Sequence, residues 1–143
     1  MSHPPAKILL VEDNDDHAEL IERALDDFGV EGTLSRAKDG EAALEHLFGE
    51  GCEERRPDFI FLDLRLPRVD GLEVLRRIKE RPELRSVPVV VLTTSSADRD
   101  LASAYDSHVN AYVVKPVDYE SLEKMLQDTS TFWLAWNRRS GHK

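Results

Sequence analysis

Four short apolar runs constrain the fold of this 143-residue chain, because each one ends abruptly in a polar or charged residue. The runs are continuous and rich in branched side chains, which is typical of strands buried on both faces of a parallel sheet. In such sheets ligands bind just beyond the carboxyl ends of the strands. We therefore expect the residues that follow the runs to meet at one edge of a sheet. The runs and the residues that end them are 8–11 with Glu12 and Asp13, 59–62 with Asp63, 89–92 with Thr93 and Thr94, and 112–114 with Lys115.

Apolar residues recur at helical spacing between these runs, as from Leu20 to Phe28. A more polar run over residues 33–37 is expected to form an edge strand. Strand and helix then alternate five times, which predicts an α/β fold: a doubly wound five-stranded parallel sheet with the strand order 2-1-3-4-5 and right-handed crossovers. This order places the first and third strands side by side and therefore brings Asp13 close to Asp63.

Residues with short polar side chains precede the helical segments and are expected to cap them, because their oxygens can accept hydrogen bonds from the free N–H groups of the first turn. One pair has the spacing of a capping box. The segment 49–57 is expected to be a charged loop. The predicted caps are Asn14, Asp15 and Asp16 for the first helix, Asp39, the box formed by Asp70 and Glu73, Ser95 and Asp98, and Asp118.

Composition and charge exclude several classes of protein. With 41% hydrophobic residues the chain can bury the core of one compact domain. A net charge of −9 argues against partners with anionic surfaces, so we expect no nucleic acid and no membrane. No apolar run approaches the roughly 20 residues that span a bilayer, the first residues lack a signal-peptide core, and the single cysteine, Cys52, excludes an internal disulfide framework. A soluble cytoplasmic protein is expected.

Three carboxylates are predicted to gather at the sheet edge, from Glu12, Asp13 and Asp63. They would repel one another unless a cation joined them. Mg²⁺ suits such a site because it binds one or two carboxylates together with water and phosphate oxygens. Since no cluster of His or Cys accompanies the acids, zinc is not expected. The alternative is that Glu12 and Asp13 only cap the first helix.

The same edge also carries groups that suit phosphoryl transfer. A carboxylate such as that of Asp63 can accept a phosphoryl group as an acyl phosphate. Thr93 supplies a hydroxyl and Lys115 a mobile cation, and both can bind phosphate oxygens. Each residue also has a structural alternative: Thr93 can be a strand end or a helix cap, and Lys115 a solvated surface lysine. The isomer of the Lys115–Pro116 bond is left open.

In these motifs the chain resembles the receiver domain of two-component response regulators, over about residues 6–128. The resemblance implies a flavodoxin-like receiver fold of five βα units. Each motif is weak alone, but all of them occur in the family's order and at similar spacing. The matching pieces are Val11-Glu12-Asp13-Asn14, Asp63-Leu64-Arg65-Leu66-Pro67 followed by Asp70-Gly71, Leu92-Thr93-Thr94-Ser95, and Tyr112-Val113-Val114-Lys115-Pro116.

The resemblance implies a role for each matching position. The phosphoryl donor would be a phosphohistidine of a sensor histidine kinase, and the domain itself would catalyse the transfer and a slow autodephosphorylation. It would thus be a phosphoacceptor signalling domain and not an enzyme that turns over a separate substrate. The implied roles are Asp63 as phosphoacceptor; Asp13 as direct Mg²⁺ ligand, Glu12 through water and Arg65 through its backbone carbonyl; Thr93 and Lys115 as the phosphate-sensing pair; and Tyr112 as an aromatic switch.

A finer resemblance points to the single-domain regulators paired with bacterial and cyanobacterial phytochromes, carried by residues 105–110 and 132–134 among others. It implies that the partner kinase is a bacteriophytochrome. Two features depart from the usual pattern. Glu12 stands where the family often has an aspartate, and Arg65 is long enough to reach over the phosphate and change the rate of dephosphorylation.

The end of the chain is expected to provide the output surface. We predict a receiver domain over residues 1–130 and a C-terminal extension over 131–143, which is too short for an effector domain. Since dense apolar patches seldom stay exposed and Trp is favoured at interfaces, the extension predicts a homodimer. The alternative is that it folds back on its own domain. The predicted interface residues are Tyr112, Phe132, Trp133 and Trp136.

Two other functions compete with the phosphoaccepting receiver. One is a Mg²⁺-dependent aspartyl-phosphate phosphatase of the haloacid-dehalogenase type. That class expects an acid two residues after the nucleophile, where this chain has Arg65. The other is an inactive, receiver-shaped dimerisation module, against which the presence of Asp13, Asp63, Thr93 and Lys115 argues.

Overall fold

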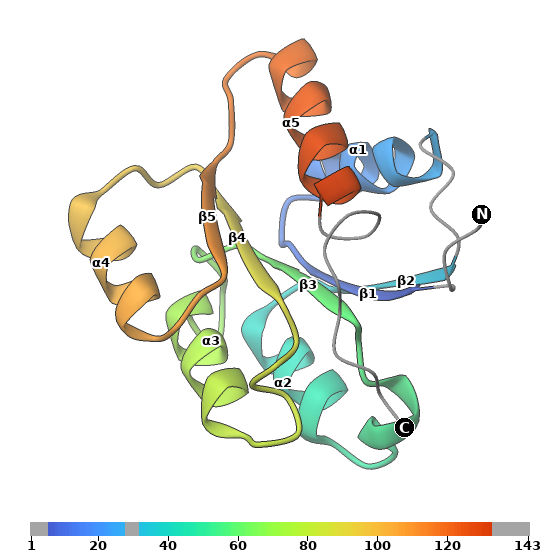
Figure 1. Cartoon of the computed structure of the whole chain (residues 1–143), viewed down its shortest axis with the longest axis vertical. Helices are drawn as coiled ribbons and strands as arrows, with labels where there is room; N and C mark the ends of the chain where they lie inside the picture. The colour runs from blue at the N-terminus through green and yellow to red at the C-terminus, as the bar shows by residue number, and fades with distance from the viewer. Residues whose placement is uncertain (1–5, 28–31, 133–143) are drawn as a thin grey trace.

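Five parallel strands form one sheet in the order β2-β1-β3-β4-β5, which confirms the predicted topology (Figure 1). The structure, a computed structural model, describes residues 6–27 and 32–132. The helices and strands in chain order are β1 (Ala6–Val11), α1 (Asp15–Asp27), β2 (Gly32–Ala37), α2 (Gly40–Phe48), the 3-10 helix η1 (Cys52–Arg55), β3 (Phe59–Leu62), α3 (Gly71–Glu80), β4 (Val89–Thr93), α4 (Asp98–Asp106), β5 (Ala111–Val114) and α5 (Tyr119–Thr131).

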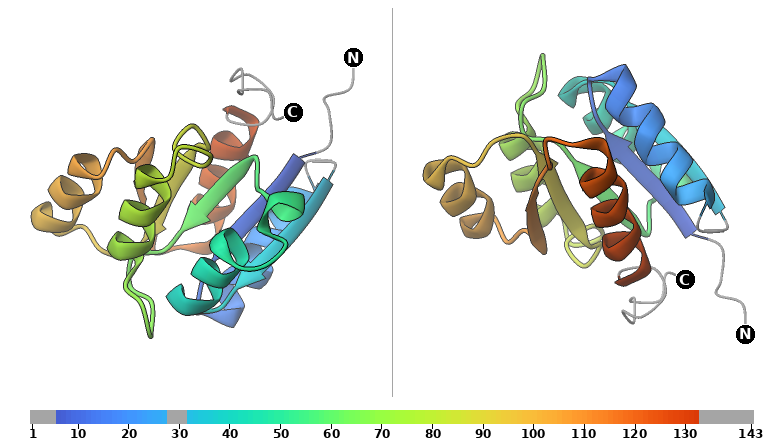
Figure 2. Two further views of the ribbon diagram at one scale, coloured as in Figure 1. Left: turned by 90° about the horizontal axis from the view of Figure 1, so that it is seen from below. Right: turned by 90° about the horizontal axis from the view of Figure 1, so that it is seen from above.

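Helices cover both faces of the sheet (Figure 2). Helices α1 and α5 pack on one face, and α2, α3 and α4 lie on the other. The alternation of side chains along a strand produces these two layers. In β1, Ile8 and Leu10 belong to the layer with α1 and α5, whereas Leu9 and Val11 belong to the layer with α2 and α3. β3 is buried over its whole length, as expected for a strand at the centre of a parallel sheet.

Three predicted helix caps are confirmed. Asn14 Oδ1 accepts a hydrogen bond from the backbone N–H of His17 at 3.0 Å, whereas Asp15 and Asp16 lie inside the first turn of α1. Asp39 caps α2 through Ala42 N at 2.7 Å. Asp118 caps α5 through the N–H of the third helical residue at 2.9 Å. These caps fix the points at which the chain turns from the sheet edge into each helix.

The predicted capping box of α3 is wrong. Asp70 is the N-cap residue, but its side chain makes no capping hydrogen bond. The carboxylate of Glu73 is instead bound by Arg76 and Arg77 on the next turn. Since the guanidinium groups carry a full charge, they bind this carboxylate in preference to the backbone N–H of the cap residue.

The predicted caps of α4 are also wrong, because Ala97 is the N-cap residue and offers no side-chain oxygen. Asp98 is the first residue inside the helix. Ser95 lies before it, and its hydroxyl donates to the carboxylate of Asp100 at 2.5 Å. The expected loop over residues 49–57 contains the short helix η1. Within the described parts of the chain, no helix is long and apolar enough to cross a membrane.

Candidate functional site

The ends of β1 and β3 bring Glu12, Asp13 and Asp63 together, as predicted. Val11 pairs with Leu62 in the sheet, so the segments that follow these two residues begin side by side. The backbone N–H of Asp63 donates to Val11 O at 3.0 Å and continues the ladder by one step. The acids therefore lie at the carboxyl edge of the sheet, where doubly wound folds bind ligands.

The three carboxylates form a group that can hold a divalent cation. Each offers one oxygen, and these oxygens all lie within 4.8 Å of one another. Glu12 and Asp63 are buried, and Asp13 is exposed to solvent. Oxygen donors alone, with one ligand open to water, fit a hard ion such as Mg²⁺. Burial raises the pKa of Glu12 to about 7, although the nearby Lys115 ammonium opposes this rise.

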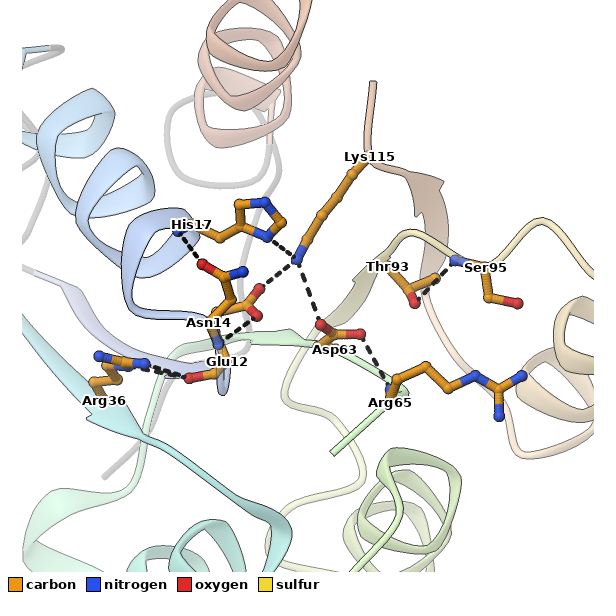
Figure 3. A network of polar contacts seen from close by, with 9 residues as sticks. All are labelled: Glu12, Asn14, His17, Arg36, Asp63, Arg65, Thr93, Ser95 and Lys115. Atoms are coloured by element: carbon orange, nitrogen blue, oxygen red, sulfur yellow. Dashed lines mark hydrogen bonds and ion pairs between the residues drawn. The ribbon is translucent and has the colours of Figure 1, made fainter. Parts of the chain in front are cut away.

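Lys115 reaches from the end of β5 into this acidic group (Figure 3). Its Nζ lies 2.5 Å from Glu12 Oε1 and 3.4 Å from Asp63 Oδ2, and its side chain is only 3% exposed. The backbone N–H of Lys115 donates to Thr93 O at 2.7 Å, which extends the pairing of β5 with β4. The Lys115–Pro116 peptide is trans. The structure thus rules out the alternative of a solvated surface lysine.

His17 is a member of the site that the sequence reasoning missed. Its Nδ1 lies 2.9 Å from Lys115 Nζ. Because an ammonium group can only donate, Nδ1 must accept, and the ring is neutral with its proton on Nε2. Burial and the Lys115 charge both lower the pKa of His17, which favours this neutral form. Its place in the first turn of α1, directly after the acidic loop, is the only signal that the sequence offered.

Arg36, from the edge strand β2, was also missed. Its Nε and Nη2 donate to the backbone carbonyl of Glu12 at 3.1 and 2.9 Å. Its Nη1 lies 2.8 Å from Asp15 Oδ1. One guanidinium therefore holds both ends of the loop that carries Glu12 and Asp13.

Thr93 ends β4 on the side of Asp63 away from His17 (Figure 3). It is fully buried, and its Oγ1 accepts a hydrogen bond from the N–H of Ser95 at 3.3 Å. Tyr112 is half-buried, and its hydroxyl donates to Ser95 O at 2.9 Å. Burial raises the pKa of Tyr112, so the phenol is neutral and able to donate. Both predicted switch residues thus contact the same loop residue, Ser95.

Arg65 is held beside Asp63 by its backbone, and its guanidinium points away from Asp63 (Figure 3). Its N–H donates to Asp63 Oδ1 at 3.1 Å. Its side chain extends away from Asp63 (Figure 3). The guanidinium binds Asp100 of α4. The expected reach of Arg65 over a phosphate on Asp63 is therefore not the arrangement in this structure. Asp100 was missed, because its position in the first turn of a helix is typical of any acidic residue.

Several large apolar side chains are exposed over α4, β5 and α5. Phe132, from the predicted interface, is 53% exposed, and Tyr112, from the same prediction, is half-buried. Trp133 and Trp136 lie outside the described residues. The exposed set is Leu101, Tyr105, Val114, Val117, Tyr119 and Phe132.

Comparison with known proteins gives a consistent assignment. Residues 8–127 match the response regulator receiver domain. The probable methanogenesis regulatory protein FilR2 of Methanothrix harundinacea is 49% identical over 138 residues, which cover 96% of this chain and 89% of that protein. The response regulator Rcp1 of Synechocystis sp. is 43% identical over 135 residues, which cover 93% of this chain and 92% of Rcp1.

Solved structures agree with this result. The crystal structure of the Mn²⁺-bound form of Rcp1 has a TM-score of 0.90 and 40% identity, covering 96% of this chain and 100% of that one. The phosphorylated cyanobacterial phytochrome response regulator RcpA has a TM-score of 0.91 and 38% identity, with the same coverage. These relatives confirm the finer resemblance to phytochrome response regulators. Receiver domains are signalling domains that take a phosphoryl group from sensor histidine kinases. This chain belongs to the response regulator receiver domain family.

Proposed function

We propose that this protein is a single-domain response regulator that accepts a phosphoryl group on Asp63 from a sensor histidine kinase. One observation carries the proposal: the Asp63 carboxylate sits at the open edge of the sheet between two acids and a buried ammonium. One of its oxygens faces Lys115 Nζ, and the other accepts from the backbone of Arg65. The relative RcpA supports the proposal, because it has been crystallised in a phosphorylated form.

In the transfer, an Asp63 oxygen forms a bond to phosphorus while the bond from phosphorus to the donor imidazole nitrogen breaks. The leaving nitrogen then takes up a proton. Lys115 needs little movement to bind a phosphoryl oxygen, since it already lies beside Asp63. The same groups would support a slow autodephosphorylation by water.

We assign Mg²⁺ binding to the carboxylates of Asp13 and Asp63, to Glu12 through water, and to the backbone carbonyl of Arg65. The Mn²⁺-bound form of Rcp1 supports a divalent ion at this edge. A bound Mg²⁺ supplies neutralisation of the negative charge on the transferring group. Arg36 contributes by holding the carbonyl of Glu12, and so fixes the loop that presents the acidic pair.

The signal is a two-state change that starts at Thr93. Phosphorylation adds negative charge and new acceptor oxygens at Asp63, and both Lys115 and the Thr93 hydroxyl gain by approaching them. Because Thr93 and Tyr112 are joined through Ser95, movement of Thr93 disturbs the hydrogen bond of the Tyr112 hydroxyl. The inward rotation of Tyr112 would then change the surface formed by α4, β5 and α5.

We infer that the kinase is a phytochrome-type light sensor, a bacteriophytochrome, because RcpA is a phytochrome response regulator. We also propose a homodimer through α4, β5, α5 and the extension over residues 131–143. The exposed apolar residues of this face support that interface. Size-exclusion chromatography with light scattering on the wild type and Trp133→Ala tests it. A monomer in both proteins would exclude the dimer.

Intact mass spectrometry tests the central proposal. The protein is incubated with Mg²⁺ and phosphoramidate, a small phosphodonor, and one added phosphoryl group is expected. The addition should disappear in Asp63→Asn and in the presence of EDTA. Rapid turnover of many phosphate esters would instead support the phosphatase alternative, and a complete lack of addition would support the inactive module.

A further inference from the structure

A buried carboxylate on α4 holds the guanidinium of Arg65. Asp100 is only 5% exposed, although it lies in the first turn of a surface helix. Its Oδ2 accepts from Arg65 Nη2 and from the hydroxyl of Ser95, the latter at 2.5 Å. The side chain of Arg65 is 52% exposed and can therefore move into solvent, whereas the side chain of Asp100 is only 7% exposed and is enclosed by the protein. The phosphoacceptor function described above makes no use of Asp100.

The position of Arg65 connects this contact to the acceptor. Its backbone N–H is bound to Asp63 Oδ1 at 3.1 Å, so the base of its side chain is fixed beside the acceptor. Its guanidinium is turned toward α4 (Figure 3). A rotation of this side chain about its own bonds can exchange Asp100 for an anion on Asp63. A guanidinium is well suited to that anion, since its planar fork binds phosphate oxygens.

We propose that Asp100 is a positioning residue that competes with the phosphoryl group on Asp63 for Arg65, and thereby shortens the lifetime of the acyl phosphate. This inference rests on the proposed phosphorylation of Asp63. In the resting protein Asp100 retains Arg65. After phosphorylation, Arg65 is shared between two anions, and only the fraction that has left Asp100 binds the phosphoryl oxygens and shields the phosphorus atom from water.

The free-energy cost of removing Arg65 from Asp100 limits how often Arg65 binds the phosphoryl group. A buried carboxylate that loses its cation has a large desolvation penalty. The Ser95 hydroxyl reduces this penalty, because it remains bound to Asp100 when Arg65 departs. Ser95 also accepts the hydrogen bond of Tyr112 through its carbonyl. Release of Arg65 from Asp100 therefore changes the surroundings of Ser95, the residue that binds the Tyr112 hydroxyl.

A purely structural role for Asp100 makes a different prediction. An acid in the first turn stabilises a helix through the helix dipole, and this effect needs no Arg65. Asp98 provides the matched control, because it lies in the same turn, carries the same charge and is exposed. Loss of a dipole interaction would lower the melting temperature in both variants, and it would not tighten binding at Asp63.

Four variants separate these roles: Asp100→Asn, Arg65→Gln, the double variant and Asp98→Asn. Each is phosphorylated with phosphoramidate, and the decay of the phosphorylated species is followed by intact mass. Beryllofluoride, an analogue of the phosphoryl group, is titrated in parallel by calorimetry. Asp100→Asn should lengthen the half-life and tighten beryllofluoride binding by about tenfold, the effect of one charge-assisted hydrogen bond. Asp98→Asn should match the wild type.

The double variant decides the mechanism. It should behave as Arg65→Gln alone, because the effect of Asp100 acts only through Arg65. If Asp100→Asn has the same effect with and without Arg65, or if it shortens the half-life, the proposal is overturned. If the wild type itself gains no phosphoryl group, the proposed function has failed instead.

A measurement on the wild type keeps the test independent of folding in the variants. The Nε–H resonance of Arg65 is identified by its loss in Arg65→Gln, and its shift is followed as beryllofluoride and Mg²⁺ are added. A clear shift supports the exchange of partners. An unchanged resonance at saturation shows that Arg65 stays on Asp100, which contradicts the proposal.

Discussion

Replacing Lys115 by Met tests whether the resting site is held together by one buried cation. In the structure Lys115 Nζ joins Glu12 and Asp63 at 2.5 and 3.4 Å. All three groups are buried. Met has a similar length and shape but no charge, so the substitution removes the ammonium and leaves the two carboxylates facing each other. We expect the free energy of unfolding at pH 8, in EDTA, to fall by about 3 kcal/mol, at the lower end of the range for breaking a buried ion pair.

The loss should depend on pH with a defined sign. Burial raises the pKa of Glu12 from its ordinary value of 4.5 to about 7, and Lys115 opposes this rise. Without Lys115 the pKa of Glu12 in the folded protein is higher still. A carboxyl group with a raised pKa contributes stability below about pH 4.5 that is lost as the pH rises through the folded value. The free energy of unfolding of Lys115→Met should therefore be close to that of the wild type at pH 5 and differ most from it at pH 8.

Urea unfolding followed by far-UV circular dichroism measures both quantities. The control is Lys124→Met, which removes an exposed lysine that pairs with Asp128 at 3.5 Å with 75% of its side chain exposed. This control should change the stability by less than about 1 kcal/mol at either pH. An equal loss for Lys115→Met at pH 5 and pH 8, or no loss at all, would refute the electrostatic reasoning. Added Mg²⁺ should restore part of the stability of Lys115→Met at pH 8.

Three further predictions follow from single contacts. Arg36→Gln should weaken Mg²⁺ binding by about tenfold in calorimetry, because it releases the carbonyl of Glu12, and unchanged affinity would show that this loop is rigid without it. Asp39→Ala should lower the free energy of unfolding by about 1 kcal/mol, whereas Asp70→Ala should have almost no effect, since only Asp39 makes a capping bond. Tyr112→Phe should cost about 1 kcal/mol in urea unfolding, and a larger cost would mean that the hydroxyl does more than bind Ser95.

The sheet and the centre of the site were predictable because the responsible signals are local. Each apolar run both forms a strand and places its next residue at the carboxyl edge, so Asp63 and Lys115 were located by the same pattern that located β3 and β5. The caps were predictable only in part. Asp39 caps its helix, but the similar Asp70 does not, since the backbone N–H of Glu73 donates to the Asp70 carbonyl and not to its side chain.

The residues that surround the centre could not be predicted, since their roles depend on contacts between distant segments. His17 meets Lys115 across 98 positions of sequence, and Arg65 meets Asp100 across 35. No periodicity or motif encodes such a pair. Each of these side chains also has an ordinary local explanation, such as an acid in the first turn of a helix. Only the arrangement of the strands shows which of them face the acceptor.

The two cations beside the acceptor are restrained to different degrees, and this difference sets the order in which they can respond. Lys115 and Glu12 are both buried. If Lys115 moved away from Glu12, both charges would lose their partner without gaining contact with water, which is costly. Lys115 can, however, reach a phosphoryl group on Asp63 with little movement, because Asp63 is already its neighbour. Arg65 must move its guanidinium further, but half of its side chain is already in solvent. The resting charges therefore favour a site in which Lys115 binds the phosphoryl group first, and in which Asp100 decides how often Arg65 joins it.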